Sequence, residues 1–237
     1  MTCHFIRWDT TSEVFNTHRL SSDLVEKTLN FSHKRRKRFL QGRILLAEMM
    51  FYLYRLPVLP PITATPTGRP YFVDPYLPDF SLAYAGNTVG ALLSLEGKVG
   101  LDIEVIRARG RNLQQQYQSV TEQAWIEEQD DRLEAETQLW SIRQCVLKLC
   151  GLNNDGQETL HLYPFSGHLR SSAAPIVHVM SEAGEYLSWA CARTPGLERL
   201  ICWRYDDRLG LRKKSEISSR NPPLSTHFLK LTSLPAR

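Results

Sequence analysis

The stretch from Phe80 to Val105, FSLAYAGNTVGALLSLEGKVGLDIEV, decides the fold. Its last part, Val99 to Val105, alternates aliphatic residues with Gly100, Asp102 and Glu104, which predicts a strand. Because successive side chains of a strand point to opposite faces, both acids project from one face while the aliphatic residues face a core. The acid face is either a solvated outer face or a place where two carboxylates about 7 Å apart share one hard cation. On both interpretations this face lies outside the core.

Two further strands precede the acidic one. Phe80 to Tyr84 and Val89 to Leu95 are apolar runs joined by a turn at 85–88. A second turn at 96–98 leads into the acidic strand. The sequence therefore predicts an antiparallel meander that ends in the acidic strand.

A long basic helix is predicted before this meander. Ser32 can cap a helix that opens with the cations KRRKR at 34–38 and becomes apolar toward Tyr54. Cations in a first helical turn oppose the helix dipole. The segment is thus either a solvated basic face or an anion site, in which Arg38 and Arg43 present guanidinium forks to phosphate oxygens.

A second long helix is best defined over Leu139 to Cys150. Its apolar residues form one stripe, while Trp140, Gln144 and Lys148 recur every four residues on an adjoining face, and Gly151 is a natural C-cap.

Strands are predicted at 158–165, 174–180, 186–192 and 199–205, which would give a second meander packed on a helix. The residues from 211 onward are basic, rich in serine and proline and without clear periodicity, as is typical of a mobile or draped tail.

Composition limits the classes of protein to consider. The chain has 237 residues, 42% of them hydrophobic and 23% charged, which is ordinary for a globular protein of one large domain or two halves. Its net charge of +4 is a mild positive field that suits an acidic partner or a phosphorylated ligand. The cysteines are scattered and odd in number, and the N-terminus lacks a signal peptide's apolar region. We therefore expect a cytoplasmic protein with free thiols.

Four pieces of the chain, taken in order, resemble one family. They are RRKRFLQGR at 35–43, GRPYF at 68–72, GLDIE at 100–104 and WSIRQCVLK at 140–148. Their order and spacing, over roughly residues 30–152, resemble the Sfp-type 4′-phosphopantetheinyl transferase superfamily, and within it the enterobacterial-style members.

The resemblance implies an α/β (α+β) fold that is a pseudo-dimer. Each of two similar α/β halves would be an antiparallel meander packed on a long helix, with the active site at the junction. We accordingly expect an N-terminal half at 1–105, a C-terminal half at 106–210 and the basic tail at 211–237.

The resemblance also implies the site. In this family the acids of the DIE motif hold Mg²⁺ against coenzyme A, which assigns Asp102 and Glu104 as metal ligands, and the usual third acid is Gln144 here. Lys148 matches a lysine that contacts phosphate, and Glu122 lies where the family has a glutamate proposed as general base, so both are catalytic candidates. The residues expected to contact coenzyme A are Arg38, Arg43, Arg69, Tyr84, Arg143 and Lys148.

Two departures from the family pattern change what the site can do. Gln144 donates no charge, so the metal site holds two formal negatives where the usual site holds three, and weaker Mg²⁺ affinity is expected. Ala83 and Tyr84 stand in AYAG where the family has Ser-His-Ser-Gly, and a tyrosine offers a single neutral donor.

The activity that the resemblance implies is Mg²⁺-dependent transfer of the 4′-phosphopantetheine group from coenzyme A to a serine of an apo acyl or peptidyl carrier protein, by a monomer. Carrier proteins present acidic helices, so the positive charge of the chain would assist docking. The alternative is a catalytically degenerate relative that binds coenzyme A or a carrier protein without transfer. A nucleic-acid-binding or other anion-binding module built on 34–38 and the basic tail lacks an aromatic platform and a recognisable motif. We therefore expect neither a nucleic-acid nor a membrane partner.

Overall fold

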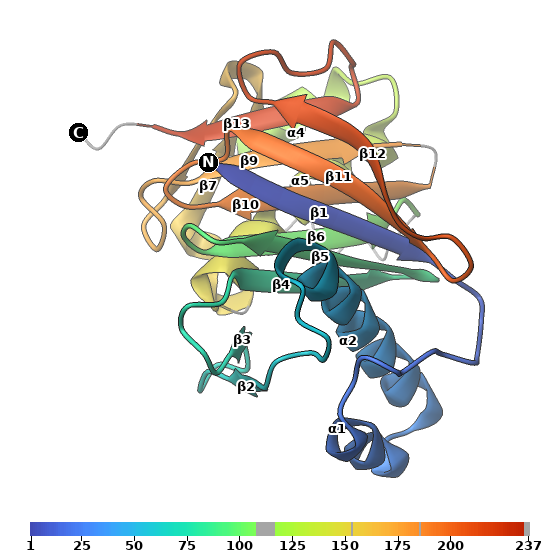
Figure 1. Ribbon diagram of the computed structural model, residues 1–237. Coiled ribbons are helices and arrows are strands. Elements are labelled where there is room, and N and C mark those ends of the chain that lie inside the picture. The colour runs from blue at the N-terminus through green and yellow to red at the C-terminus, as the bar shows by residue number, and fades with distance from the viewer. Residues whose placement is uncertain (108–116, 153, 185, 235–237) are drawn as a thin grey trace.

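The structure is a computed structural model that describes residues 1–107, 117–152, 154–184 and 186–234 (Figure 1). Its α-helices are α1 (Ser22–Lys27), α2 (His33–Tyr54), α4 (Val120–Glu127) and α5 (Arg132–Cys150). Short 3₁₀ turns lie at Thr28–Asn30, Asn154–Thr159 and Pro164–Ser166. No helix in these ranges is both long and apolar enough to span a membrane.

The strands form two large sheets and one small one. The first sheet has the order β12 (Gly210–Ser218), β11 (Arg199–Asp206), β1 (Thr2–Asp9), β5 (Thr88–Ser94) and β4 (Asp79–Ala85). The second has the order β6 (Val99–Val105), β10 (Leu187–Arg193), β9 (His178–Ala183), β13 (Phe228–Ser233), β8 (His168–Ser171) and β7 (Leu160–Tyr163). β2 (Ile62–Ala64) and β3 (Pro70–Phe72) pair by themselves. The coarse prediction of a mixed α+β fold is confirmed.

The sheets and helices stack in four layers, because each sheet has two apolar faces. On the first sheet, Ile6 and Leu93 face α2, while Phe5 and Leu92 face the second sheet. On the second sheet, Trp189 and Cys191 of β10 face the first sheet, while Ala190 and Ala192 face α5. The order α2, first sheet, second sheet, α5 gives three buried hydrophobic clusters.

The predicted meander is wrong in its third strand. β4 and β5 form the expected antiparallel hairpin, but β6 crosses to the second sheet and pairs antiparallel with β10. The free edge of β6 is satisfied by side chains of β4: Asp79 accepts from the Val99 N–H at 2.8 Å, and Ser81 accepts from the Leu101 N–H at 3.0 Å. Because an edge strand exposes a row of unpaired backbone groups, these two bonds link the edges of the two stacked sheets at β4 and β6.

The prediction of a mobile or draped tail is also wrong for 211–218 and Phe228–Ser233, which are strands. β12 extends the first sheet and β13 lies inside the second. β12 carries no visible periodicity because it is an exposed edge strand with Ile217 as its one buried residue.

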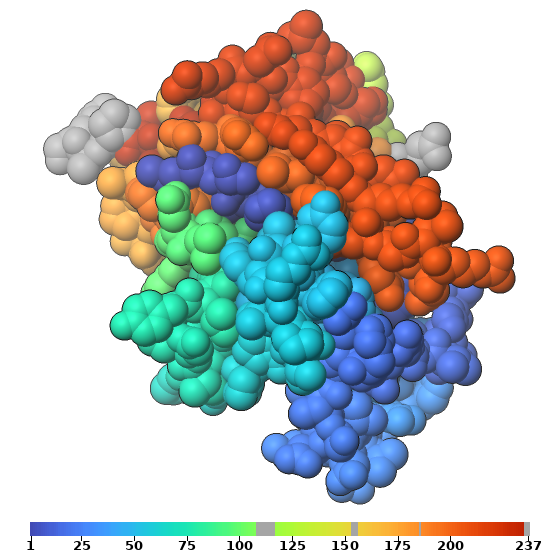
Figure 2. Space-filling view, viewed as in Figure 1, coloured from blue at the N-terminus to red at the C-terminus, as the bar shows by residue number. Residues whose placement is uncertain are grey.

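Strands from both ends of the chain therefore share a sheet. In Figures 1 and 2 the blue strand β1 lies between the orange C-terminal strands and the green strands. The first sheet takes β11 and β12 from beyond residue 105, and the second takes β6 from before it. The pseudo-dimer of two similar halves is thus not confirmed, and the division at 105/106 stays a prediction.

Both predicted long helices are found, although α5 begins at Arg132, before the predicted 139, and the Ser32 side chain makes no capping hydrogen bond to α2. α2 begins at His33, directly after Ser32, and α5 ends at Cys150, where Gly151 adopts the left-handed conformation with φ of 68°. Only a residue without a Cβ reaches this region at no steric cost. Both long helices thus end where the sequence predicts, and α5 ends next to the β2–β3 turn.

Candidate functional site

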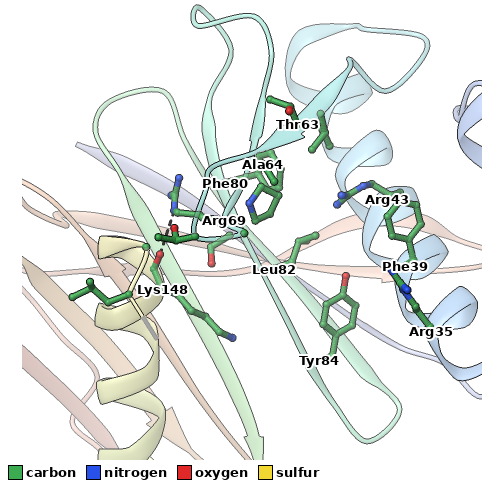
Figure 3. Close-up of a pocket in the computed structure, with 17 residues that line it drawn as sticks. Arg35, Phe39, Arg43, Thr63, Ala64, Arg69, Phe80, Leu82, Tyr84 and Lys148 are labelled. Carbon is green, nitrogen blue, oxygen red and sulfur yellow. Dashed lines mark hydrogen bonds between the residues drawn. The ribbon is translucent and has the colours of Figure 1, made fainter. Parts of the chain in front are cut away.

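A cavity of about 730 Å³ lies between α2, the β2–β3 turn, β4 and the end of α5. Its volume is in the range of about 300–1,000 Å³ that is usual for small-molecule sites. Figure 3 shows the α2 side chains on one side, Arg69 and Lys148 on the other, and the β4 side chains between them. The charged residues that line it are Arg35, Arg43, Arg69 and Lys148, and its aromatic residues are Phe39, Phe80 and Tyr84. The cavity therefore suits an anionic ligand that also has an apolar or aromatic part.

One face of α2 supplies Arg35, Phe39 and Arg43, which follow one another at intervals of four residues. The Arg43 guanidinium lies over the Phe39 ring, 4.7 Å from its centroid. Burial lowers the pKa of Arg43 from its ordinary value, and within the described residues its buried Nε has no hydrogen-bond partner. A partly buried guanidinium group whose Nε has no acceptor favours an anion in the cavity.

Arg38 does not line the cavity. Its side chain is exposed, whereas Arg35, which the sequence analysis did not single out, lies in the lining. The signal was available: counting back from Arg43 in steps of four gives Phe39 and Arg35, and Arg38 falls on another face. The positive charge of Arg38 still favours a lower pKa of Tyr84, against the larger effect of burial.

Tyr84, which is expected to contact coenzyme A, lies in the cavity lining. Its hydroxyl occupies the space that a Cβ at Gly42 of α2 would need, so this glycine of the RFLQGR segment makes room for the ring. Burial raises the pKa of Tyr84 to about 12. At neutral pH the side chain is therefore a neutral O–H donor next to Arg43.

The acid face of β6 is covered by α5. A Cβ at Gly100 would collide with the carbonyl oxygen of Cys145 and the backbone of Leu149, so the glycine lets the helix lie directly on the strand. Asp102 is only 5% exposed as a result, and Glu104 is half-buried. The interpretation of a solvated outer face is wrong for Asp102.

Lys148 connects this buried acid to the cavity. Its Nζ donates to Asp102 Oδ1 at 2.7 Å, and its side chain also lines the cavity. The lysine side chain is 37% exposed and that of the acid 7%. A buried carboxylate is costly without a compensating charge, and the ammonium supplies one.

Arg69 braces the wall of the cavity. Its guanidinium donates to both carboxylate oxygens of Asp79, at 3.0 and 2.5 Å. It also donates to the carbonyl oxygens of Lys148, at 3.2 Å, and Val99, at 3.1 Å. Arg69 thus faces the cavity, but Asp79 offsets its charge and most of its donors are used to join β4, β6 and α5.

Glu122 and Arg143 lie together in a different place. Both Glu122 carboxylate oxygens accept from Arg143 Nη2, at 2.7 and 2.8 Å, and one also accepts from the backbone N–H of Ser119 in a capping box. Glu122 has no exposed surface, Arg143 has 3%, and neither lines the cavity. The structure therefore brings this pair together as a link between α4 and α5, and does not bring it to Lys148.

The residues expected to hold a metal have oxygen atoms that suit a hard cation, but only two of the three carry a negative charge. Asp102 already holds a cation, the Lys148 ammonium, and Glu104 follows on the same face of β6. Gln144 lies one helical turn before Lys148, and its buried Nε2 has no hydrogen-bond partner among the described residues. Two carboxylates and an amide oxygen are ligands that Mg²⁺ takes. In the described ranges no three His, Cys, Asp or Glu side chains gather at one point.

Comparison with known proteins gives a full-length match and several partial ones. No protein-family model matches the chain. The uncharacterized protein YieE of Escherichia coli (strain K12) is 40% identical over 232 residues, which cover 95% of this chain and 93% of YieE. The 4′-phosphopantetheinyl transferase AcpT of the same strain is 36% identical over 121 residues, or 49% of this chain and 59% of AcpT. A putative 4′-phosphopantetheinyl transferase of Haemophilus influenzae is 27% identical over 160 residues, or 62% of this chain and 68% of that protein. The partial matches support a relationship to the phosphopantetheinyl transferases.

Proposed function

We propose that this chain, which belongs to one family with YieE and is related over about half its length to AcpT, transfers the 4′-phosphopantetheine group of coenzyme A to a serine of an apo acyl or peptidyl carrier protein. The observation that carries the proposal is the cationic cavity that meets a buried acid through Lys148. The cavity is lined by side chains from before and after residue 105. A site at the junction of two halves, 1–105 and 106–210, would have such a lining. We propose that the protein acts as a monomer in the cytoplasm.

Arg35 and Arg43 have the chemistry to hold the phosphates of coenzyme A. Their guanidinium groups match phosphate oxygens in pairs, and no carboxylate lines the cavity beside them in the described part of the chain. Tyr84 adds one neutral donor next to Arg43. In this proposal Arg69 positions the wall and Lys148 contacts the pyrophosphate.

The reaction forms one P–O bond and breaks another. The serine oxygen of the carrier protein attacks the β-phosphorus of coenzyme A, and the bond from this phosphorus to the bridging oxygen breaks. The leaving group, 3′,5′-bisphosphoadenosine, takes the electron pair, and the serine proton passes to a base or to water. Mg²⁺, when Asp102, Glu104 and Gln144 hold it, supplies charge neutralisation on the pyrophosphate. Lys148 and the α2 arginines neutralise the leaving phosphates.

Glu122 has a structural part in this proposal. Its carboxylate is fully buried and occupied by Arg143 and the Ser119 N–H. A general base has to lie within hydrogen-bond reach of the proton that it accepts. The base role is therefore left to water or to the carrier protein.

A second candidate function is binding without transfer. It is favoured by Gln144, which removes one charge from the metal site, and by the Arg69–Asp79 pair, which removes one cation from the cavity. Such a relative would bind coenzyme A, or hold a carrier protein through its positive surface.

Incubation with coenzyme A, Mg²⁺ and an apo carrier protein separates the two functions. Transfer adds the mass of one phosphopantetheinyl group to the carrier protein, which intact-protein mass spectrometry detects. Coenzyme A binding measured by calorimetry, with no mass gain on fatty-acid, polyketide or peptide carrier proteins, would favour binding without transfer. The Arg43→Ala variant should weaken the coenzyme A affinity whether coenzyme A is a substrate or only a bound ligand.

A further inference from the structure

We propose that Lys148 is a built-in counter-ion of Asp102, which a divalent cation displaces toward the cavity, so that the cation and the anionic ligand favour each other's binding. The inference rests on the proposed function for the place of the divalent cation. It goes beyond that function by making Lys148 a residue that couples two binding events.

The two partners of this ion pair differ in their freedom to move. Asp102 is fixed in the middle of β6 and its side chain is 7% exposed. Lys148 has a flexible four-carbon stem and a side chain that is 37% exposed and lines the cavity. When the pair separates, the ammonium is therefore the group that moves, and it moves to the cavity side.

The backbone of Lys148 is held independently of its side chain. Arg69 Nε donates to the Lys148 carbonyl oxygen at 3.2 Å, and Arg69 Nη2 donates to the Val99 carbonyl oxygen at 3.1 Å. Gly100 brings the same helix and strand into direct contact. These contacts join α5 to β6, so the ion pair is not needed as a brace.

A divalent cation on Asp102 competes with the ammonium for the carboxylate, because two positive charges a few ångströms apart repel each other. The displaced ammonium needs an acceptor, and the cavity offers a place for one. Arg35 and Arg43 already favour an anion there, and the buried Arg43 Nε has no hydrogen-bond partner among the described residues. An anion would accept from Lys148 and so reduce its competition for Asp102. By linkage, the cation must then strengthen anion binding by the same factor.

The test measures Mn²⁺ binding by electron paramagnetic resonance, with and without 3′,5′-bisphosphoadenosine and with no carrier protein. In the unsubstituted protein the nucleotide should tighten Mn²⁺ binding by about fivefold or more. Lys148→Gln can still donate a hydrogen bond to Asp102 but carries no charge. This variant should bind Mn²⁺ more tightly than the unsubstituted protein when the nucleotide is absent. The factor by which the nucleotide increases the Mn²⁺ affinity should fall toward one.

Two control variants isolate the position of the charge. Lys98→Met removes an exposed lysine from the turn just before β6, and its Mn²⁺ binding should match that of the unsubstituted protein. Lys148→Arg keeps a cation opposite Asp102, so its Mn²⁺ binding without nucleotide should be no tighter. Far-ultraviolet circular dichroism and thermal unfolding check that every variant is folded.

Equal or weaker Mn²⁺ binding by Lys148→Gln, or an unchanged effect of the nucleotide, would overturn the inference. The absence of Mn²⁺ binding in both proteins would overturn it as well. Coupling through Lys148 without transfer to a carrier protein would contradict the proposed function alone. Transfer without this coupling would contradict the inference alone.

Discussion

Arg69 and Asp79 form a two-point ion pair at the place where β3, β4, β6 and α5 meet. Asp79 also accepts from the Val99 N–H, and Arg69 also donates to the Lys148 carbonyl oxygen. The pair therefore fixes the end of α5 against the free edge of β6. The place of Lys148 beside the cavity depends on this connection.

Arg69→Met should destabilise the protein strongly. It leaves the Asp79 carboxylate, whose side chain is 19% exposed, without its partner, and breaking a pair of this kind costs about 3–5 kcal/mol. Urea denaturation measures the free energy of unfolding. The matched control is Arg212→Met, which removes an exposed arginine of β12 and should change that free energy by no more than about 0.5 kcal/mol. Equal stability of the two variants would contradict the bracing role.

Glu122→Gln tests whether the buried acid is structural or catalytic. It leaves Arg143, which is 3% exposed, without a counter-charge, so the free energy of unfolding should fall by about 3–5 kcal/mol. The activity per folded molecule, measured as transfer to a carrier protein below the unfolding temperature, should be unchanged. The double variant Glu122→Met with Arg143→Met should recover part of the stability, because the uncompensated charge is gone. Full stability with lost transfer would instead assign Glu122 as the base.

Gln144→Glu should tighten the binding of divalent cations. The substitution adds a third carboxylate near Asp102 and Glu104, and affinity for hard cations rises with the charge of the ligands, here by roughly tenfold. Mn²⁺ titration followed by electron paramagnetic resonance measures the change, and transfer activity should rise or stay the same. Gln138→Glu, on the same helix but bonded to the His227 carbonyl oxygen, is the control that should leave Mn²⁺ binding unchanged. A clear fall in transfer by Gln144→Glu would mean that the amide has a role of its own.

His227 and Glu134 make the stability of the protein depend on pH. The hydrogen bond from the ring to Glu134, at 2.5 Å, raises the pKa of His227 above its ordinary value of 6.5. The contribution of this pair is therefore fully present below the unfolded pKa and is lost as pH rises through the folded one. His227→Gln should lower the melting temperature at pH 5.5 and leave it unchanged at pH 9. A shift of the same size at both pH values would show that protonation is not involved.

The parts of the fold that depend on local pattern are predictable from the sequence. The C-terminal end of α5 follows from Gly151, the two long helices follow from the helical spacing of apolar residues, and the hairpin β4–β5 follows from its turn at 85–88. The pairing of β6 with β10 joins segments that are far apart in the sequence, and no local pattern near β6 indicates it. Strand pairing between distant segments therefore limits what the pattern alone can predict.

The candidate site shows the same limit. The residue pattern suggests Arg43 and Asp102, the family resemblance adds Tyr84 and Lys148, and the structure places these four residues at or beside one cavity. It does not reveal that α5 covers the acid face, although Gly100 is a signal for such a close approach. The expectation that the acid face lies outside the core is wrong for Asp102, which is 5% exposed.

The most direct measurement is the intact mass of an apo carrier protein after incubation with this protein, coenzyme A and Mg²⁺. The account predicts that the carrier protein gains one phosphopantetheinyl group. It also predicts that Asp102→Asn abolishes the gain, while the exposed-site control Arg212→Met leaves it unchanged. Equal mass gain with Asp102→Asn, or no gain on any carrier protein while coenzyme A is bound, would contradict transfer at this site.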